Sequence, residues 1–143
     1  MKNFTMRLTF AVATLAAAAL SASAQTYKAD VPMAFSAGGK RMPAGTYAFV
    51  VSTGATVHPV VTVRNQASSQ AAVIMALPGS DAPKAWRDAA TPKIGFECAA
   101  GACSLAKLYD GRDISAMKFA TPKVSPAQKE RMASITLSLA RTE

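Results

Sequence analysis

Apolar and polar residues alternate along much of the chain, and this period of two is typical of half-buried β-strands. The first alternating run extends from Tyr27 to Phe35, with its apolar side chains at the odd-numbered positions. Pro32 lies inside this run. Because proline cannot donate to a strand ladder, we expect this strand to lie at a sheet edge or to contain a bulge. Further strand-like runs occupy residues 47–51, 57–64, 71–77, 93–98, 103–109 and 114–119.

Two stretches in the middle of the chain depart from the alternation. Residues 71–77 form an unbroken apolar run that ends at Pro78-Gly79, which predicts a buried strand rather than a helix. Residues 78–91 then form the longest gap between strand-like runs. Because connections of this length are often functional or mobile, we expect a long loop here.

The C-terminal part of the chain combines a helix signal with a strand signal. Ser125 is a favourable N-cap, Pro126 suits the first helical position, and Gln128 completes a capping box. Residues 134–139 then alternate between polar and apolar, which favours a closing strand after one or two helical turns. A helix through residues 133–141 is the alternative that the pattern leaves open.

Taken together, these elements predict an all-β, mainly antiparallel fold. The short strands and frequent turns are typical of a small sandwich or barrel of about seven or eight strands, here with one short helix near the C-terminus. The pattern contains no internal repeat and no second domain. Residues 25–143 are therefore predicted to form a single β-domain.

Residues 1–24 have the three parts of a secretory signal peptide. Basic residues at the start precede an uncharged, mainly apolar run at residues 8–20, and Ser21-Ala22-Ser23-Ala24 supplies small residues before a predicted cut at Gln25. A transmembrane anchor is the alternative, but a spanning helix needs about 20 apolar residues and this run is shorter. We expect a secreted or periplasmic protein with no transmembrane span after cleavage.

The charge of the chain is positive but dispersed. There are 16 Lys and Arg residues against 8 Asp and Glu, which gives a formal net charge of +8. The basic residues form no dense run and are not interleaved with aromatic residues, so we expect no nucleic-acid partner. A solvated basic surface is the simplest interpretation, and weak attraction to anionic lipid or polysaccharide is the alternative.

The two cysteines are the most specific local feature. Cys98 and Cys103 flank four small residues, including Gly101, between two strand-like runs. In an exported chain this spacing predicts a disulfide across a β-hairpin. A redox-active pair is the alternative, but such pairs usually have a Cys-x-x-Cys spacing at a helix N-terminus.

Trp86 is the only tryptophan and lies in the long gap beside Arg87. One interpretation is a ring tucked over the open end of the sandwich. The other is a binding surface formed by Trp86 and Arg87, because these residue types are enriched at binding hot spots.

The chain has few groups for catalysis or metal binding. His58 is the only histidine, and with two cysteines it cannot form an ordinary tetrahedral zinc site without carboxylates. Asp110 and Asp113 lie in one Asp-Gly turn, where turn formation is the simpler role and acid–base chemistry the alternative. No phosphate-binding, dinucleotide-binding or Gly-x-Ser-x-Gly motif occurs. We expect no catalytic residue, no metal and no cofactor.

A pattern near the mature N-terminus resembles a group of small proteins. It consists of Val31-Pro32-Met33-Ala34-Phe35, the turn Gly38-Gly39-Lys40, and Pro43-Ala44-Gly45-Thr46-Tyr47, with a later Lys93-Ile94-Gly95-Phe96 strand. This resembles uncharacterised small secreted proteins of soil bacteria, in which a tryptophan is common where this chain has Leu108-Tyr109. The resemblance implies an exported β-domain and brings no particular activity.

The leading hypothesis is an exported, non-enzymatic β-domain that binds an envelope or extracellular protein or polysaccharide. The second is a binder of a small apolar ligand in a barrel cavity, which Met33, Met42, Met75 and Met117 could line. A third, weaker hypothesis is a hydrolase that uses Asp110 or Asp113.

Overall fold

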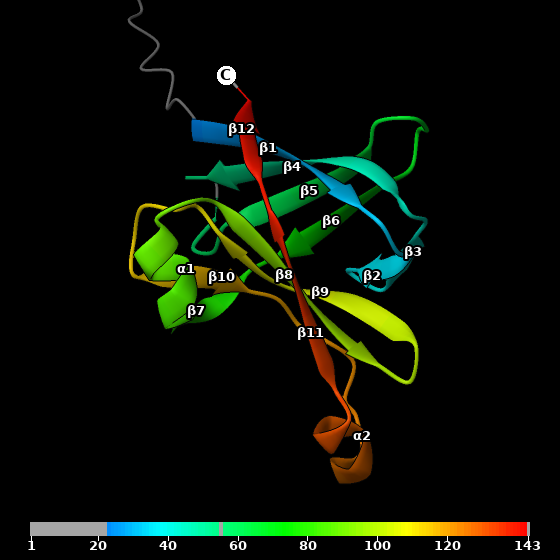
Figure 1. Cartoon of the computed structure of the whole chain (residues 1–143). Helices are drawn as coiled ribbons and strands as arrows, with labels where there is room; N and C mark the ends of the chain where they lie inside the picture. Colours follow the sequence, from blue (N-terminus) through cyan, green and yellow to red (C-terminus); the bar gives the residue numbers. More distant parts are fainter. Residues whose placement is uncertain (1–22, 55, 143) are drawn as a thin grey trace, which may run out of the picture.

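The computed structural model describes residues 23–54 and 56–142, so most of the predicted leader, residues 1–22, lies outside the described residues. The described chain forms two β-sheets packed as a sandwich, with two short helices (Figure 1). The predicted all-β, mainly antiparallel fold is confirmed, but the described residues form twelve strands and two short helices rather than about seven or eight strands and one helix, because several predicted runs and gaps divide into short strands. The sheets do not close into a barrel, since each has its own strand order and its own edges.

The first sheet is antiparallel throughout and has the order β12-β1-β4-β5-β6. Its strands are β1 (Ser23–Val31), β4 (Gly45–Thr53), β5 (Val60–Asn65), β6 (Ala71–Met75) and β12 (Ala140–Thr142).

The second sheet has the main order β11-β8-β9-β10-β7, and a small β2–β3 hairpin is joined to it. Strand β2 pairs in parallel with one end of β9, and β10 pairs with the other end. The strands of the second sheet are β2 (Phe35–Ala37), β3 (Lys40–Met42), β7 (Leu77–Asp81), β8 (Lys93–Ala99), β9 (Ala102–Tyr109), β10 (Ser115–Lys118) and β11 (Ala133–Ser138). The helices are α1 (Lys84–Ala89) and α2 (Pro126–Glu130).

Aromatic side chains from both sheets meet in the core. The ring of Phe35 lies edge-on to that of Tyr47 at 5.0 Å and to that of Phe96 at 5.1 Å, so it joins the first sheet to the second. All three side chains are fully buried. Contacts of this geometry add to the stabilisation that comes from burying the rings.

The alternation predicted for the first strand is confirmed, but the strand's position in its sheet differs from the prediction. Tyr27, Ala29 and Val31 are buried, as the odd positions predict. The expectation of an edge or bulged strand was wrong, because β1 lies between β12 and β4 and ends at Val31, before Pro32. The proline therefore lies between β1 and β2, where its missing N–H costs no ladder hydrogen bond.

The middle of the chain contains more structure than predicted. Residues 71–77 do not form a fully buried strand: in β6 Ala72 and Ile74 are buried, whereas Val73 and Met75 are exposed. The expectation was wrong because one face of this edge strand is open to solvent. The expected long loop at residues 78–91 contains most of β7 and the whole of α1.

The C-terminal segment joins the two sheets. The capping box at Ser125 and Gln128 is present and begins α2. Residues 133–142 are then extended, so the closing strand is confirmed and the helical alternative is wrong. Strand β11 belongs to the second sheet and β12 to the first, and they are separated by the buried Leu139 (Figure 1).

Candidate functional site

A cleft of about 410 Å³ opens at one end of the sandwich, between the two sheets. Strands β1 and β4 form its wall on the first sheet, and β9 and β10 form the opposite wall. The segment before β5, the residue between β6 and β7, and the start of β7 complete it. The disulfide lies at the opposite end of the β8–β9 hairpin, because Cys103 is near the start of β9 and the cleft begins at its end.

The deep part of the cleft is mainly apolar. Tyr27 from the first sheet and Leu108 from the second both line it and are fully buried, and Ala76 is also buried there. The Tyr27 hydroxyl is satisfied, since it donates to Gln25 Oε1 at 2.5 Å. The guanidinium of Arg141 lies 5.8 Å from the centre of the Tyr27 ring. These buried side chains close the cleft at its floor, and the Tyr27 hydroxyl there is already paired.

The sequence-predicted polar groups meet at the same cleft. His58 lies on the segment before β5, and Asp110 and Asp113 lie in the β9–β10 turn, yet all three line it. Sequence reasoning had treated them as separate features, because more than fifty positions separate His58 from the turn. Their convergence depends on how the two sheets pack, which no local motif reports.

Asp110 takes part in the turn, as its sequence context predicts. Its Oδ1 accepts hydrogen bonds from the backbone N–H of Arg112 at 2.9 Å and of Asp113 at 3.4 Å. Its backbone carbonyl accepts from Arg141 Nη2 at 3.3 Å. One carboxylate oxygen thus stabilises the backbone that forms the cleft rim.

The mouth of the cleft also carries exposed apolar side chains. Val57 and Leu77 line it and are 93% and 41% exposed. These two residues add accessible apolar surface to the mouth of the cleft.

Sequence reasoning missed Val57 at this site because the residue continues an apparent strand pattern. Strand β5 begins only at Val60, after His58-Pro59. The proline gives the one available signal, since it interrupts the ladder and leaves the preceding residues outside the sheet.

The four methionines considered as a cavity lining lie in different parts of the structure. Met117 lines the cleft. Met42 is fully buried in the core, Met75 is exposed on β6, and Met33 packs against the edge of the core. The four residues therefore do not form one cavity surface.

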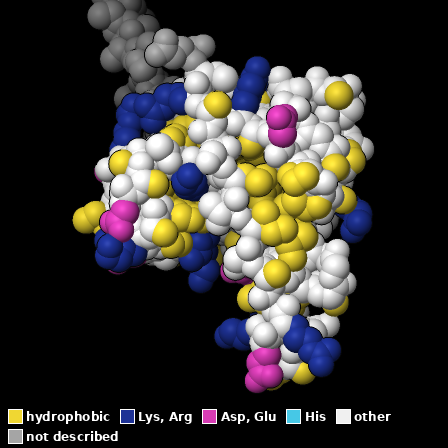
Figure 2. All heavy atoms as spheres, in the orientation of Figure 1, with side chains coloured by type: hydrophobic (Ala, Val, Ile, Leu, Met, Phe, Trp, Pro, Cys, Tyr) yellow, Lys and Arg dark blue, Asp and Glu magenta, His cyan; other side chains and the backbone are white. Residues whose placement is uncertain are grey.

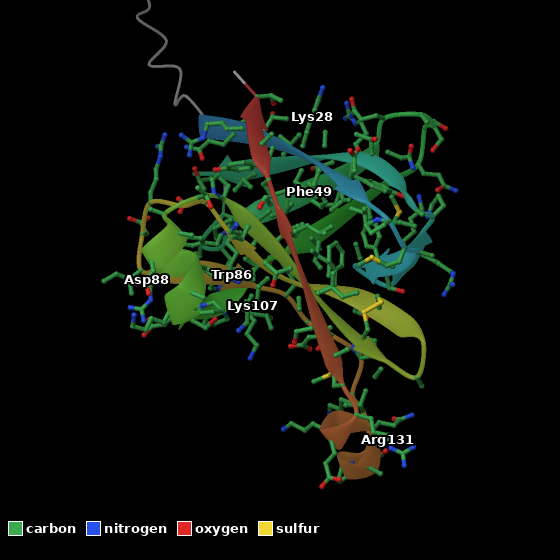
Figure 3. All side chains as sticks on the ribbon, viewed as in Figure 1. Lys28, Phe49, Trp86, Asp88, Lys107 and Arg131 are labelled. Carbon is green, nitrogen blue, oxygen red and sulfur yellow. A yellow bond between two sulfur atoms is a disulfide. The ribbon has the colours of Figure 1, made fainter. Side chains whose placement is uncertain are left out.

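Trp86 lies on the outer face of the second sheet rather than over the open end of the sandwich. It is 8% exposed and projects from α1 onto the sheet, beside Lys107 (Figure 3). A Cβ built at Gly95 would lie 2.8 Å from Trp86 Cη2, so the ring packs directly on the backbone of β8. Its ring centre is 6.4 Å from that of Tyr109. Arg87, on the same helix, is exposed.

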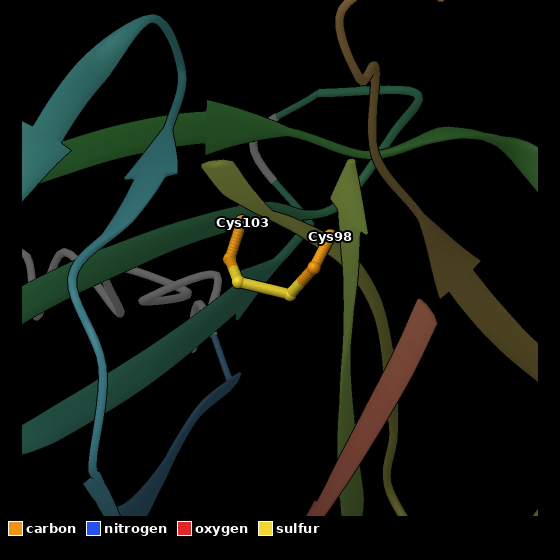
Figure 4. The surroundings of a disulfide bond; sticks show 2 residues. All are labelled: Cys98 and Cys103. Atoms are coloured by element: carbon orange, nitrogen blue, oxygen red, sulfur yellow. A yellow bond between two sulfur atoms is a disulfide. The ribbon is translucent and has the colours of Figure 1, made fainter. Parts of the chain in front are cut away.

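The predicted disulfide is confirmed. Cys98 and Cys103 are direct cross-strand partners in the β8–β9 hairpin, with Cα atoms 4.0 Å apart (Figure 4). Ala100 and Gly101 form the tip with positive φ angles of 50° and 77°. The bond closes a very small ring and therefore holds the hairpin register.

The described part of the chain contains no group of three or more His, Cys, Asp or Glu residues that could hold a metal ion. None of the helices in residues 23–54 and 56–142 is long and apolar enough to cross a membrane. In the comparisons with known proteins, the chain matches no protein-family model, no curated protein and no solved structure.

Proposed function

We propose that this chain is an exported, non-enzymatic β-domain that binds a small, mainly apolar ligand in the cleft between its sheets. The observation that carries the proposal is the cleft itself, which has a volume of about 410 Å³ and a lining that combines apolar side chains with several polar groups. Ligand sites commonly have volumes of about 300–1,000 Å³ and combine apolar walls with a few polar groups. The proposal favours the ligand-binding hypothesis over a general envelope-binding module.

The arrangement of the walls supports a ligand with an apolar body and a polar end. The apolar body would lie against the accessible apolar side chains of the lining, Val57, Leu77 and Met117. The polar end would reach the rim, where His58, Ser115 and Asp113 supply donors and acceptors. Burying the apolar part supplies the binding free energy, and the rim groups fix the orientation.

The rim is also consistent with binding rather than hydrolysis. Asp110 Oδ1 already accepts two backbone hydrogen bonds in its turn, which gives that carboxylate a structural role. The predicted leader and the disulfide support export to the periplasm or the cell exterior, where disulfides persist. The resemblance to small secreted bacterial β-proteins supports the same destination.

The proposal is tested by titration with N-phenyl-1-naphthylamine, a neutral apolar dye that fluoresces when it is bound in an apolar site. We expect saturable binding of one dye molecule per chain. Val57→Asp places a charge at the mouth of the cleft and should weaken binding about tenfold or more, because the charge opposes entry of an apolar group.

Val73→Asp is the matched control, because Val73 is also exposed but lies on β6, away from the cleft lining. It should leave dye affinity unchanged. Equal weakening by both substitutions, or no saturable binding by the unsubstituted chain, would show that the cleft is not an apolar ligand site.

A further inference from the structure

Strand β11 presents an open edge of the second sheet. Within residues 23–54 and 56–142 it pairs with β8 alone, and it lies at the front of the molecule (Figure 1). Leu139 continues its register, and the N–H of that residue donates to Pro92 O at 3.0 Å. Because alternate residues of an antiparallel strand bond to opposite sides, the N–H and C=O groups of Ser134, Thr136 and Ser138 point away from β8.

The edge of the first sheet at β6 is covered, in contrast. The Lys40 ammonium donates to Ala71 O at 2.9 Å. The turn between β2 and β3 lies against the same edge, since a Cβ built at Gly38 would come within 2.8 Å of Val73 O. A second chain therefore cannot pair along β6 without displacing the β2–β3 hairpin.

The remaining edges carry the features that prevent edge-to-edge pairing. Strands β3 and β12 have three residues each, and Arg41 and Arg141 place charges on them. Strand β7 contains Pro78 and Asp81. Strand β11 has six residues, ASITLS, with neither a charge nor a proline. It is the exception among the described edges.

We propose that β11 pairs antiparallel with β11 of a second copy of this chain, about a two-fold axis at Thr136. In this register Ser134 lies opposite Ser138 of the second copy, and Thr136 lies opposite its own counterpart. All three positions in each strand have outward-pointing backbone groups, so the two strands can form a regular ladder. The result is one sheet that continues through both molecules.

In this register the side chains of the two β11 strands are complementary to one another. On the outer face, Ser and Thr hydroxyls lie opposite one another, and such cross-strand pairs are favourable. On the inner face, Ile135 lies opposite Leu137 of the second copy. Both residues pack against the core but are only partly buried, so a second strand would cover them. Hydrophobic side chains gather between the sheets on the face that carries β11 (Figure 2).

Charges beside β11 also match across the two-fold axis. Lys93 pairs with Ser138, and its ammonium donates to Ser138 Oγ at 3.0 Å, so this positive charge reaches over β11. Glu97 pairs with Ser134 in the same ladder. Because Ser134 faces Ser138 of the second copy, Glu97 of each molecule lies in the same cross-strand row as Lys93 of the other. The opposite charges in each row add a weak attraction to the hydroxyl and apolar pairs, and this self-complementarity favours a second copy over an unrelated extended peptide.

The test compares sedimentation of the exported chain with that of Thr136→Lys over a wide concentration range. Thr136 is exposed, and its backbone groups do not bond to β8, so the substitution should preserve the fold. Two lysines would meet at the two-fold axis and raise the dimer dissociation constant about tenfold or more. Thr91→Lys is the matched control, since it adds the same charge at an exposed position between α1 and β8.

We expect the unsubstituted chain and the Thr91→Lys variant to dimerise alike. Hydrogen exchange of the amides of Ser134, Thr136 and Ser138 should slow as concentration rises, whereas that of Ile135 and Leu137 should not change. A chain that stays monomeric, a Thr136→Lys variant that dimerises normally, or concentration-independent exchange at the three outward amides would each overturn the proposal. Thr136 does not line the cleft, so dye binding should survive its substitution and tests the cleft separately.

Discussion

Substitution of Trp86 by alanine tests how the outer face of the second sheet is held. The ring is 8% exposed and packs on Gly95 and Tyr109, within a small buried cluster that also contains Ala82 and Ala116. A largely buried tryptophan removes about 150–250 Å² from water, which at about 25 cal/mol per Å² is roughly 4–6 kcal/mol. The void would lie near the surface and can partly refill, so we expect a loss of about 3 kcal/mol.

The assay is reversible denaturation by urea, followed by circular dichroism and compared with thermal unfolding. A loss of this size should lower the Tm by roughly 10–15 °C in a domain of this length. Arg87→Ala is the matched control on the same exposed helix and should change stability by less than about 0.5 kcal/mol. A Trp86→Ala variant that loses less than about 1 kcal/mol would refute the packing role and return Trp86 to the list of candidate binding residues.

Three further substitutions test the close packing, the disulfide and the cleft rim. Gly95→Ala should destabilise the domain by about 1–3 kcal/mol, measured by urea denaturation, because the added methyl would overlap the Trp86 ring. Replacing Cys98 and Cys103 together by serine should leave the fold formed but lower stability by about 2 kcal/mol, which calorimetry of the oxidised and substituted chains would measure. Asp110→Ala should cost about 1 kcal/mol in the same denaturation assay, whereas Asp110→Asn should cost less, since an amide oxygen can still accept the turn hydrogen bonds.

The sequence pattern predicts a strand correctly where one face of that strand is buried and the other is exposed to solvent. Tyr27, Ala29 and Val31 show this alternation, and so do the β11 residues Ile135 and Leu137. The capping box at the start of α2 was predicted correctly for the same reason, because it involves residues close together in the sequence. Each of these features depends on neighbouring residues alone, so a sequence pattern can report it.

The sheet positions of the strands were not predictable in the same way. The run at residues 71–77 is apolar throughout, and nothing local indicates that Val73 faces solvent on an edge strand. Pro32 was compatible with an edge, yet β1 ends just before it and lies inside its sheet. Strand order is set by contacts between distant segments.

The candidate site shows the same limit. Asp110 and Asp113 were recognised as a turn, and His58 as an isolated residue before a proline. Only the packing of the two sheets brings them to one cleft with Tyr27 and Leu108. Trp86 was noticed for its residue type, but Gly95, which accommodates its ring, gave no signal of its own.

Native mass spectrometry of the protein exported by its own host, purified without detergent, tests the proposed function most directly. We expect a protomer mass equal to residues 25–143 less two hydrogens, or twice that mass for the dimer, with additional mass that disappears on denaturation and is reduced in the Val57→Asp variant. A chain that carries no additional mass, and to which no apolar dye binds saturably, would contradict the assignment of the cleft as a ligand site.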